Sequence, residues 1–192
     1  MHSNLPYFFI FLDKYNSNFF QNNNTNIGII YRNYNARNRE DELSKISKVC
    51  KKKRLQLFVS NSLTLTLKFK AQGLYIPAFN KTKNYSNIEK RNLKIIGSAH
   101  NQKEIIKKIE QKCSAIFLSP TFDVEKPRKS LGIHNFNYIS NNNKITIFAL
   151  GGIIEKNVKK LKLLNSQGFG GIRMFKKKPA FKRPVFIKKK FF

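Results

Sequence analysis

Residues 144–158, KITIFALGGIIEKNV, contain an apolar run that stops at the adjacent glycines Gly151 and Gly152, just before a helical pattern starts. The chain has only 9 glycines among its 192 residues, so a pair of them indicates a specific demand on the backbone. Backbone N–H groups at the start of a helix bind phosphate, and glycine lets the phosphate approach closely. The stretch therefore predicts a strand that ends in a phosphate-binding turn, with plain turn geometry as the alternative.

Seven other short apolar runs resemble the one at residues 144–150. Most of them are apolar at consecutive positions, which is typical of parallel strands that are covered on both faces. These seven predicted strands cover residues 6–12, 27–32, 55–60, 73–78, 93–98, 114–119 and 168–175.

Helical patterns occupy most of the gaps between these strands. Before the third predicted helix, Asn101 is the expected N-cap, and Glu104 stands where a capping box needs an acidic residue. The spacing of Ile105, Ile106 and Ile109 predicts that these three side chains share the buried face. The predicted helices cover residues 40–52, 62–71, 102–112 and 155–165.

Eight strands separated by helical segments predict an α/β fold, a single compact (β/α)8 TIM barrel over residues 1–175. The chain is short for that fold, so several helices must be shortened, and an open doubly wound sheet is the alternative. We expect almost no helix in residues 13–26, and polar loops at residues 79–92 and 120–143. Residues 176–192 form a separate basic tail, which we expect to be mobile.

The formal net charge of +28 admits a nucleic-acid or anionic-membrane partner. Lysine occurs in nearly every polar segment rather than in one cluster, so a biased composition explains most of this charge and such partners are not favoured. Cys50 and Cys113 lack the spacing of a metal site and are expected to be buried, inert thiols. No apolar run approaches the roughly 18 residues that span a membrane, and no cleavable leader is visible, so a cytoplasmic protein is expected.

Active sites of such barrels lie at the carboxyl ends of the strands. Cationic, hydroxyl and amide side chains follow these ends, so the predicted ligand is anionic. Because an imidazole titrates near neutrality, His100 is the candidate catalytic acid or base. The candidate ligand-binding residues are Arg32, Asn61, Ser98, Lys126, Gly151, Gly152 and Arg173.

Five segments occur in the order and spacing of a known family: GLYIPAFN, IIGSAHNQKEI, AIFLSPTFDVEK, IFALGGIIEKNVKKL and GFGGIRMF. Over residues 27–175 the chain resembles thiamine phosphate synthase and the related TenI-type thiazole tautomerases. The resemblance implies a barrel that acts in thiamine biosynthesis on phosphorylated substrates. Thiamine phosphate synthases join a pyrimidine diphosphate to a thiazole phosphate and release pyrophosphate.

The resemblance implies a role for each matching residue. Arg32 resembles an arginine that contacts the diphosphate, and Ser98 resembles a serine near that group. Asn61 is similar to the asparagine of an Asn-Asp pair after the third strand. Gly151 and Gly152 resemble the loop that holds the thiazole phosphate.

The sequence departs from the family pattern at several positions. Tyr34 stands where a lysine contacts the diphosphate, and Arg173 stands near a position expected to be small or serine. The stretch after the sixth strand is degraded to DVEK, which leaves Lys126 as the matching lysine. The two magnesium-binding aspartates fall at Ser62 and Asn80, which are weak neutral ligands for a hard dication, so magnesium binding is expected to be weakened.

His100 points to an alternative activity. It resembles the histidine with which the tautomerases move a proton on the thiazole ring, a reaction that does not need the magnesium-binding pair. A divergent synthase is the first expectation and a tautomerase the second. A non-catalytic barrel that binds a phosphorylated ligand or nucleic acid is the remaining alternative.

Overall fold

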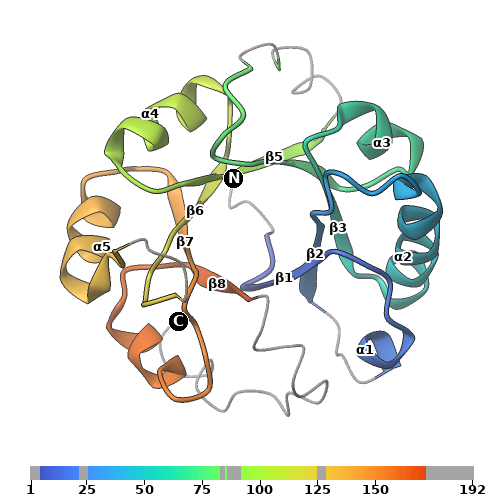
Figure 1. Ribbon diagram of the computed structural model, residues 1–192. Helices are drawn as coiled ribbons and strands as arrows, with labels where there is room; N and C mark the ends of the chain where they lie inside the picture. The colour runs from blue at the N-terminus through green and yellow to red at the C-terminus, as the bar shows by residue number, and fades with distance from the viewer. Residues whose placement is uncertain (1–4, 22–25, 83–84, 86–91, 125–128, 172–192) are drawn as a thin grey trace.

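The computed structural model describes residues 5–21, 26–82, 85, 92–124 and 129–171. Eight parallel strands follow one another around a closed barrel, and β8 closes it by pairing with β1 (Figure 1). The predicted (β/α)8 barrel is confirmed, and the open doubly wound sheet is wrong. The strands are β1 (Phe8–Leu12), β2 (Ile27–Tyr31), β3 (Gln56–Ser60), β4 (Gly73–Ile76), β5 (Lys94–Ala99), β6 (Ala115–Leu118), β7 (Thr146–Leu150) and β8 (Gly168–Gly171).

Helices surround the barrel and cover the outer face of its sheet (Figure 1). Several are one or two turns long, as the length of the chain requires. Within the described residues, none of these helices combines the length and apolar character needed to cross a membrane. The helices are α1 (Ser17–Gln21), α2 (Arg39–Lys53), α3 (Leu63–Lys68), α4 (Gln102–Glu110), α5 (Gly132–Asn141) and the 3₁₀ helix η2 (Val158–Leu163).

Three expectations about the helices are wrong. α1 lies in the segment expected to lack a helix, where the burial of Phe19 and Phe20 outweighs the polar composition. α5 lies in the expected loop at residues 120–143 and is held by the fully buried Phe136. The last predicted helix is a short 3₁₀ helix rather than an α-helix over residues 155–165. The end of the eighth predicted strand and the basic tail lie outside the described residues.

Aromatic side chains fill the barrel interior. Phe9 makes edge-to-face contacts with Phe58, Phe117 and Phe148, with ring centroids 5.1 to 5.6 Å apart. All four rings are fully buried, and such pairs add about 0.5–1.5 kcal/mol each beyond the area they bury. Because this plug occupies the centre, a ligand can bind only at an end of the barrel.

The glycine pair that follows β7 adopts a conformation that only glycine takes readily. Gly151 and Gly152 have φ values of 88° and 70°. A Cβ on Gly152 would lie 2.2 Å from the carbonyl oxygen of Phe122, so the turn packs directly against the loop after β6. Asn157 holds the turn from the other side, since its Nδ2 donates to the Gly152 oxygen at 2.7 Å and its Oδ1 accepts the Ile154 N–H at 2.9 Å.

The buried face of α4 differs from the predicted one. Ile105 is fully buried, but Ile106 and Ile109 are 49% and 46% exposed. Lys108 takes their place with 1% exposure, because its ammonium reaches carbonyl oxygens in the loop after β4. The predicted N-cap is confirmed, since the Asn101 side chain accepts the Glu104 N–H at 3.0 Å.

The two thiols are buried, as predicted. No disulfide joins Cys50 and Cys113, and burial raises the pKa of each thiol to about 12. Both side chains therefore stay protonated and unreactive at neutral pH.

We expect Gly152→Ala to destabilise the protein more than Gly132→Ala. Both residues have a positive φ, which costs an alanine about 1–2 kcal/mol. A Cβ on Gly132 meets nothing within 4 Å, whereas one on Gly152 overlaps the Phe122 carbonyl and adds a further 1–3 kcal/mol, roughly. Urea unfolding of both variants measures the difference, and equal losses would show that the contact between the two loops is not tight.

We also expect Lys108 to make stability depend on pH. Burial lowers its pKa from 10.5 to about 8, so between these values the unfolded chain binds more protons than the folded chain. The contribution of Lys108 to the free energy of unfolding therefore rises with pH from about 8 to 10.5. Lys108→Met should lose up to about 1.4 kcal/mol per pH unit of this slope in urea titrations.

The matched control for this measurement is Lys107→Met, which removes an exposed lysine from the same helix. It should keep the slope of the wild-type protein over the same pH interval. If the two variants show the same slope, the buried ammonium does not titrate as described.

Candidate functional site

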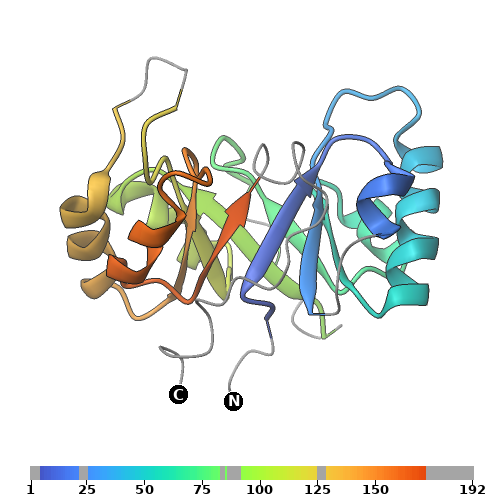
Figure 2. The same ribbon diagram turned by 90° about the horizontal axis from the view of Figure 1, so that it is seen from below.

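The carboxyl ends of the eight strands form one rim of the barrel. In the side view the strands point to the upper edge, where the loops that follow β2 and β6 rise above the barrel (Figure 2). Arg32 follows β2, Asn61 follows β3, His100 follows β5 and the glycine pair follows β7, so all of them belong to this rim. Ser98 is the penultimate residue of strand β5.

The β7 turn presents backbone donors at the rim. Among the described residues, the N–H groups of Gly151, Gly152 and Ile153 have no hydrogen-bond acceptor. Three successive free N–H groups beside two residues that lack side chains form a site where a phosphate oxygen can approach the backbone. Phosphate binding at this turn stays a prediction, and the geometry of the turn also serves the contact with the loop after β6.

Thr121 holds this turn in place, and sequence reasoning did not single it out. Its N–H donates to the Leu150 oxygen at 2.8 Å, and its hydroxyl accepts the Leu150 N–H at 3.1 Å. The next N–H, that of Phe122, donates to the Gly151 oxygen at 3.1 Å. Thr121 is fully buried, so these bonds lock the loop after β6 onto the end of β7. A threonine three residues after the end of β6 gave no signal in the sequence.

Arg32 is fixed by a carboxylate at the same rim. Its Nε and Nη2 donate to the two carboxylate oxygens of Asp13, both at 3.2 Å. This two-point contact orients the planar guanidinium and leaves three of its five N–H donors for a ligand. The same contact offsets part of the positive charge of Arg32. Asp13 follows β1 and was not among the residues expected from the sequence.

Two tyrosines lie close to Arg32 at the mouth of the barrel. The Tyr75 phenol lies beside the Ser98 hydroxyl, and burial raises the pKa of Tyr75 well above its usual value. Burial also raises the pKa of Tyr34, so both phenols are neutral donors at physiological pH. The Tyr34 ring packs edge-on against Phe79, with centroids 5.3 Å apart, and Phe79 is 63% exposed.

The residues at the expected magnesium site do not suit the ion. Asn80 Nδ2 donates to Asn61 Oδ1, and Asn80 Oδ1 accepts the Thr82 N–H at 2.7 Å. Ser62 caps α3, since its hydroxyl oxygen accepts the Leu65 N–H at 3.2 Å. The three side-chain oxygens are therefore neutral and already engaged, whereas magnesium is held by carboxylates. Within the described ranges, no cluster of three or more His, Cys, Asp or Glu residues could hold a metal.

The backbone of Asn80 is also fixed by two side chains from the end of α4 and its C-cap. Lys108 Nζ donates to the carbonyl oxygens of Pro77 and Asn80 at 2.8 and 3.1 Å. Gln111 Nε2 donates to the Asn80 and Thr82 oxygens at 3.0 and 2.7 Å. The loop after β4 is thus fixed by two buried side chains, which the sequence pattern of α4 did not predict.

His100 forms a pair with the first turn of α4. Its Nδ1 lies 2.8 Å from Glu104 Oε2, and the same oxygen accepts the His100 N–H at 2.8 Å. A carboxylate is an acceptor, so Nδ1 carries the hydrogen in the neutral ring and Nε2 holds the lone pair. In the part of the chain that the structure describes, Nε2 has no partner. The pair can therefore accept a proton at Nε2.

The structure thus brings the candidate residues of strands β2, β3, β5 and β7 to one rim, together with Asp13, Tyr34 and Asn80. Lys126 and Arg173 lie outside the described residues. His134, by contrast, is exposed on α5. The arrangement combines backbone donors, one oriented guanidinium and one imidazole paired with a carboxylate, a set that suits a phosphorylated ligand and a proton transfer.

Comparison with known proteins identifies the family to which the chain is similar. The model of the thiamine monophosphate synthase family, TMP-TENI, matches residues 24–175. Thiamine-phosphate synthases from two strains of Prochlorococcus marinus are each 30% identical over 142 and 131 residues, which are 71% and 63% of this chain. These matches cover 40% and 35% of the relatives, so the chain spans about two fifths of the length of the curated relatives it matches.

Solved structures show the same fold. Thiamine phosphate pyrophosphorylase from Pyrococcus furiosus superposes with a TM-score of 0.70 and 18% identity, covering 88% of this chain and 86% of that one. The corresponding protein from Bacteroides thetaiotaomicron gives 0.63 and 15%, covering 94% and 88%. At these identities the likeness supports the barrel alone. The family match over residues 24–175 shows more: this chain belongs to the thiamine monophosphate synthase family.

Proposed function

We propose that this chain joins a pyrimidine diphosphate to a thiazole phosphate and releases pyrophosphate, the thiamine phosphate synthase reaction. The observation that carries the proposal is the β7 turn, whose three N–H groups have no acceptor among the described residues, in a chain of this family. A phosphate group on the thiazole substrate would supply the missing acceptors. The glycines leave room for it at hydrogen-bond distance from the backbone.

The diphosphate of the other substrate would lie toward β2 and β5. Arg32 offers its remaining donors there, and Ser98 and Asn61 add a hydroxyl and an amide at the same rim. Lys126 and Arg173 are assigned to the same group from the sequence alone. Because the guanidinium is already oriented by Asp13, it needs little rearrangement when the ligand binds.

Departure of the diphosphate builds up negative charge, which must be neutralised in the transition state. The oxygens of Asn61, Ser62 and Asn80 are neutral and engaged in hydrogen bonds, so they do not suit magnesium. The neutralising groups of this chain are then Arg32, Lys126 and Arg173, with the neutral phenols of Tyr34 and Tyr75 as further donors. The rate of this reaction should therefore depend less on magnesium than the rate of a synthase that holds the ion with two carboxylates.

A second candidate reaction is isomerisation of the thiazole ring. The observation that favours it is the His100–Glu104 pair, because the carboxylate fixes the ring hydrogen on Nδ1 and leaves Nε2 as a base. Such a proton transfer needs no leaving group and no charge beyond that of the imidazole. The two reactions would share the phosphate site at the β7 turn.

Restoring the two aspartates should make the coupling reaction respond to magnesium. In the double variant Ser62→Asp, Asn80→Asp, magnesium should raise the rate of pyrophosphate release at least about tenfold more than in the wild-type protein. Aspartate also caps a helix well, so α3 should remain intact. Ser62→Asn, which caps equally well without a charge, is the control. Equal magnesium stimulation of the wild-type and double-variant proteins would contradict the metal argument.

Replacing the candidate base should abolish isomerisation. His100→Gln should slow conversion of the thiazole tautomer by about 10²–10⁴-fold while leaving the dissociation constant of thiazole phosphate within about twofold. The exposed His134 on α5 supplies the matched control, His134→Gln, which should behave as wild type. A His100→Gln protein that isomerises the thiazole normally would remove the second candidate. If the wild-type protein yields no product in either assay, only phosphate binding remains.

A further inference from the structure

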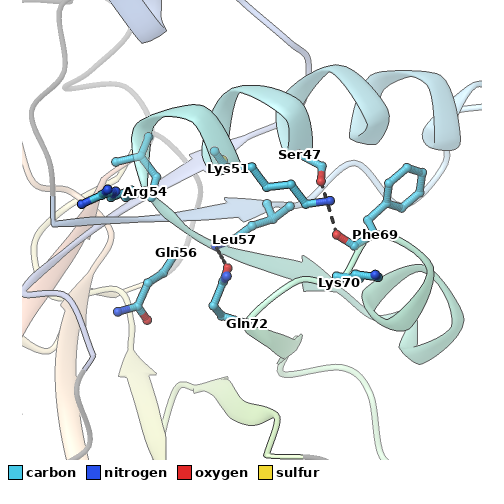
Figure 3. A pocket seen from close by; sticks show the side chains of 10 residues that line it. Ser47, Lys51, Arg54, Gln56, Leu57, Phe69, Lys70 and Gln72 are labelled. Carbon is cyan, nitrogen blue, oxygen red and sulfur yellow. Dashed lines mark hydrogen bonds between the residues drawn. The ribbon is translucent and has the colours of Figure 1, made fainter.

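A concave site lies at the end of the barrel opposite the rim. It is a groove of about 370 Å³ between α2, the start of β3 and the end of α3, within the size range of small-molecule sites. The residues that line it precede β3 and β4 or stand at the start of β3, so the groove belongs to the amino-terminal side of the strands (Figure 3). None of the rim residues discussed above lines it.

The floor of this groove is apolar. It is formed by Cys50, Leu55 and Leu57, which are all buried, and by the half-buried ring of Phe69. Burial raises the pKa of the Cys50 thiol to about 12, so the sulfur is neutral and does not repel an anion. The Ser47 hydroxyl donates to the Phe69 oxygen at 3.3 Å, so this neutral polar group already has a partner. The floor thus contains no ionised group. Such a floor favours an apolar ligand body.

The walls of the groove carry three exposed cations. Lys51 stands on α2, Arg54 follows that helix and Lys70 follows α3. Figure 3 shows Arg54 with Gln56 toward one end of the groove and Lys70 with Phe69 toward the other. No aspartate or glutamate is among the described lining residues, and none of the three cations has an acidic partner in the described part of the chain.

Two lysines next to the groove, Lys53 and Lys68, differ from these three cations because each has a hydrogen-bond partner within the protein. Lys68 pairs with Glu40, and Lys53 donates to the Phe20 oxygen, so these two do not depend on a ligand for a partner. A position near the end of a helix makes a cation tolerable through the helix dipole. In a chain with 38 basic and 10 acidic residues an unpaired cation is ordinary, so the feature of this groove is the position of three cations around an apolar floor.

One further donor of the groove is fixed in orientation. Gln72 Oε1 accepts the Leu57 N–H at 2.7 Å, so the oxygen of this amide is engaged with the backbone of β3. Its Nε2 group, which can only donate, has no partner among the described residues. A donor thus stands beside the cations at the start of β4, where an anion would accept from it.

We propose that this groove binds a small phosphate ester with an aromatic or aliphatic body. A dianionic phosphate in the groove accepts from Gln72 within the positive field of Lys51, Arg54 and Lys70, while the body of the ester covers the apolar floor. The site is separate from the rim and does not depend on the reaction proposed there. It makes the barrel a protein with a phosphate site at each end.

The probe for this proposal is 1-naphthyl phosphate, whose fluorescence is easy to follow because the chain contains no tryptophan. Titration by fluorescence anisotropy should show binding to the full-length Arg32→Gln protein, in which the rim site is weakened. The triple variant Lys51→Gln, Arg54→Gln, Lys70→Gln in that background should bind at least about tenfold more weakly. All three replaced side chains are exposed, so the fold should persist, which circular dichroism checks.

The matched control is Lys45→Gln, Lys48→Gln, Lys52→Gln, which removes the same charge from exposed positions of α2 outside the groove. It should bind the probe within about twofold of its parent, and inorganic phosphate should bind at least about tenfold more weakly than the naphthyl ester. Equal losses in the two triple variants would overturn the proposal, because the binding would then reflect net charge alone. Absence of binding in the parent, or binding of an RNA oligonucleotide in place of the ester, would overturn it as well.

Discussion

The junction between the loop after β6 and the end of β7 is the constraint on which the rim depends. Thr121 bonds to Leu150 through both its backbone and its hydroxyl, and Phe122 bonds to Gly151. These contacts force the chain after β7 to turn through two residues of positive φ in the space left by missing side chains. The N–H groups of the turn, which have no acceptor among the described residues, are a consequence of that geometry. The proposed phosphate site would therefore be built from packing and backbone conformation rather than from charged side chains.

The rest of the rim supplies charge in a different way from a metal centre. One guanidinium is oriented by Asp13, and Asn80, which stands where a carboxylate is expected, donates to the Asn61 amide oxygen. The loop that carries Asn80 is fixed from below by Lys108 and Gln111, so its position does not rely on a bound ion. Neutral oxygens that are fully engaged in hydrogen bonds make a rigid rim, but they give a dication little to bind.

Much of this could be predicted from the sequence, because consecutive apolar runs and a turn with two glycines are signals that a parallel barrel produces directly. The eight strands and the rim positions of Arg32, His100 and Gly152 follow from those signals. Thr121 and Asp13 could not be found in this way, since each acts through a partner far away in the chain. The buried face of α4 differs from the predicted one because Lys108 finds carbonyl acceptors in the loop after the neighbouring strand β4, so a charged residue is buried while Ile106 and Ile109 are exposed. α1 and α5 could not be predicted because one or two buried aromatic rings, rather than a repeated apolar pattern, hold each of them.

The central claim is that the β7 turn binds phosphate through its backbone without a divalent metal. Amide NMR spectra recorded during a titration with thiazole phosphate, in the presence of EDTA, test it directly. The account predicts that the amide signals of Gly151, Gly152 and Ile153 shift together and saturate, because their N–H groups gain an acceptor. Saturable shifts confined to other residues, or shifts at the turn that need magnesium, would contradict it.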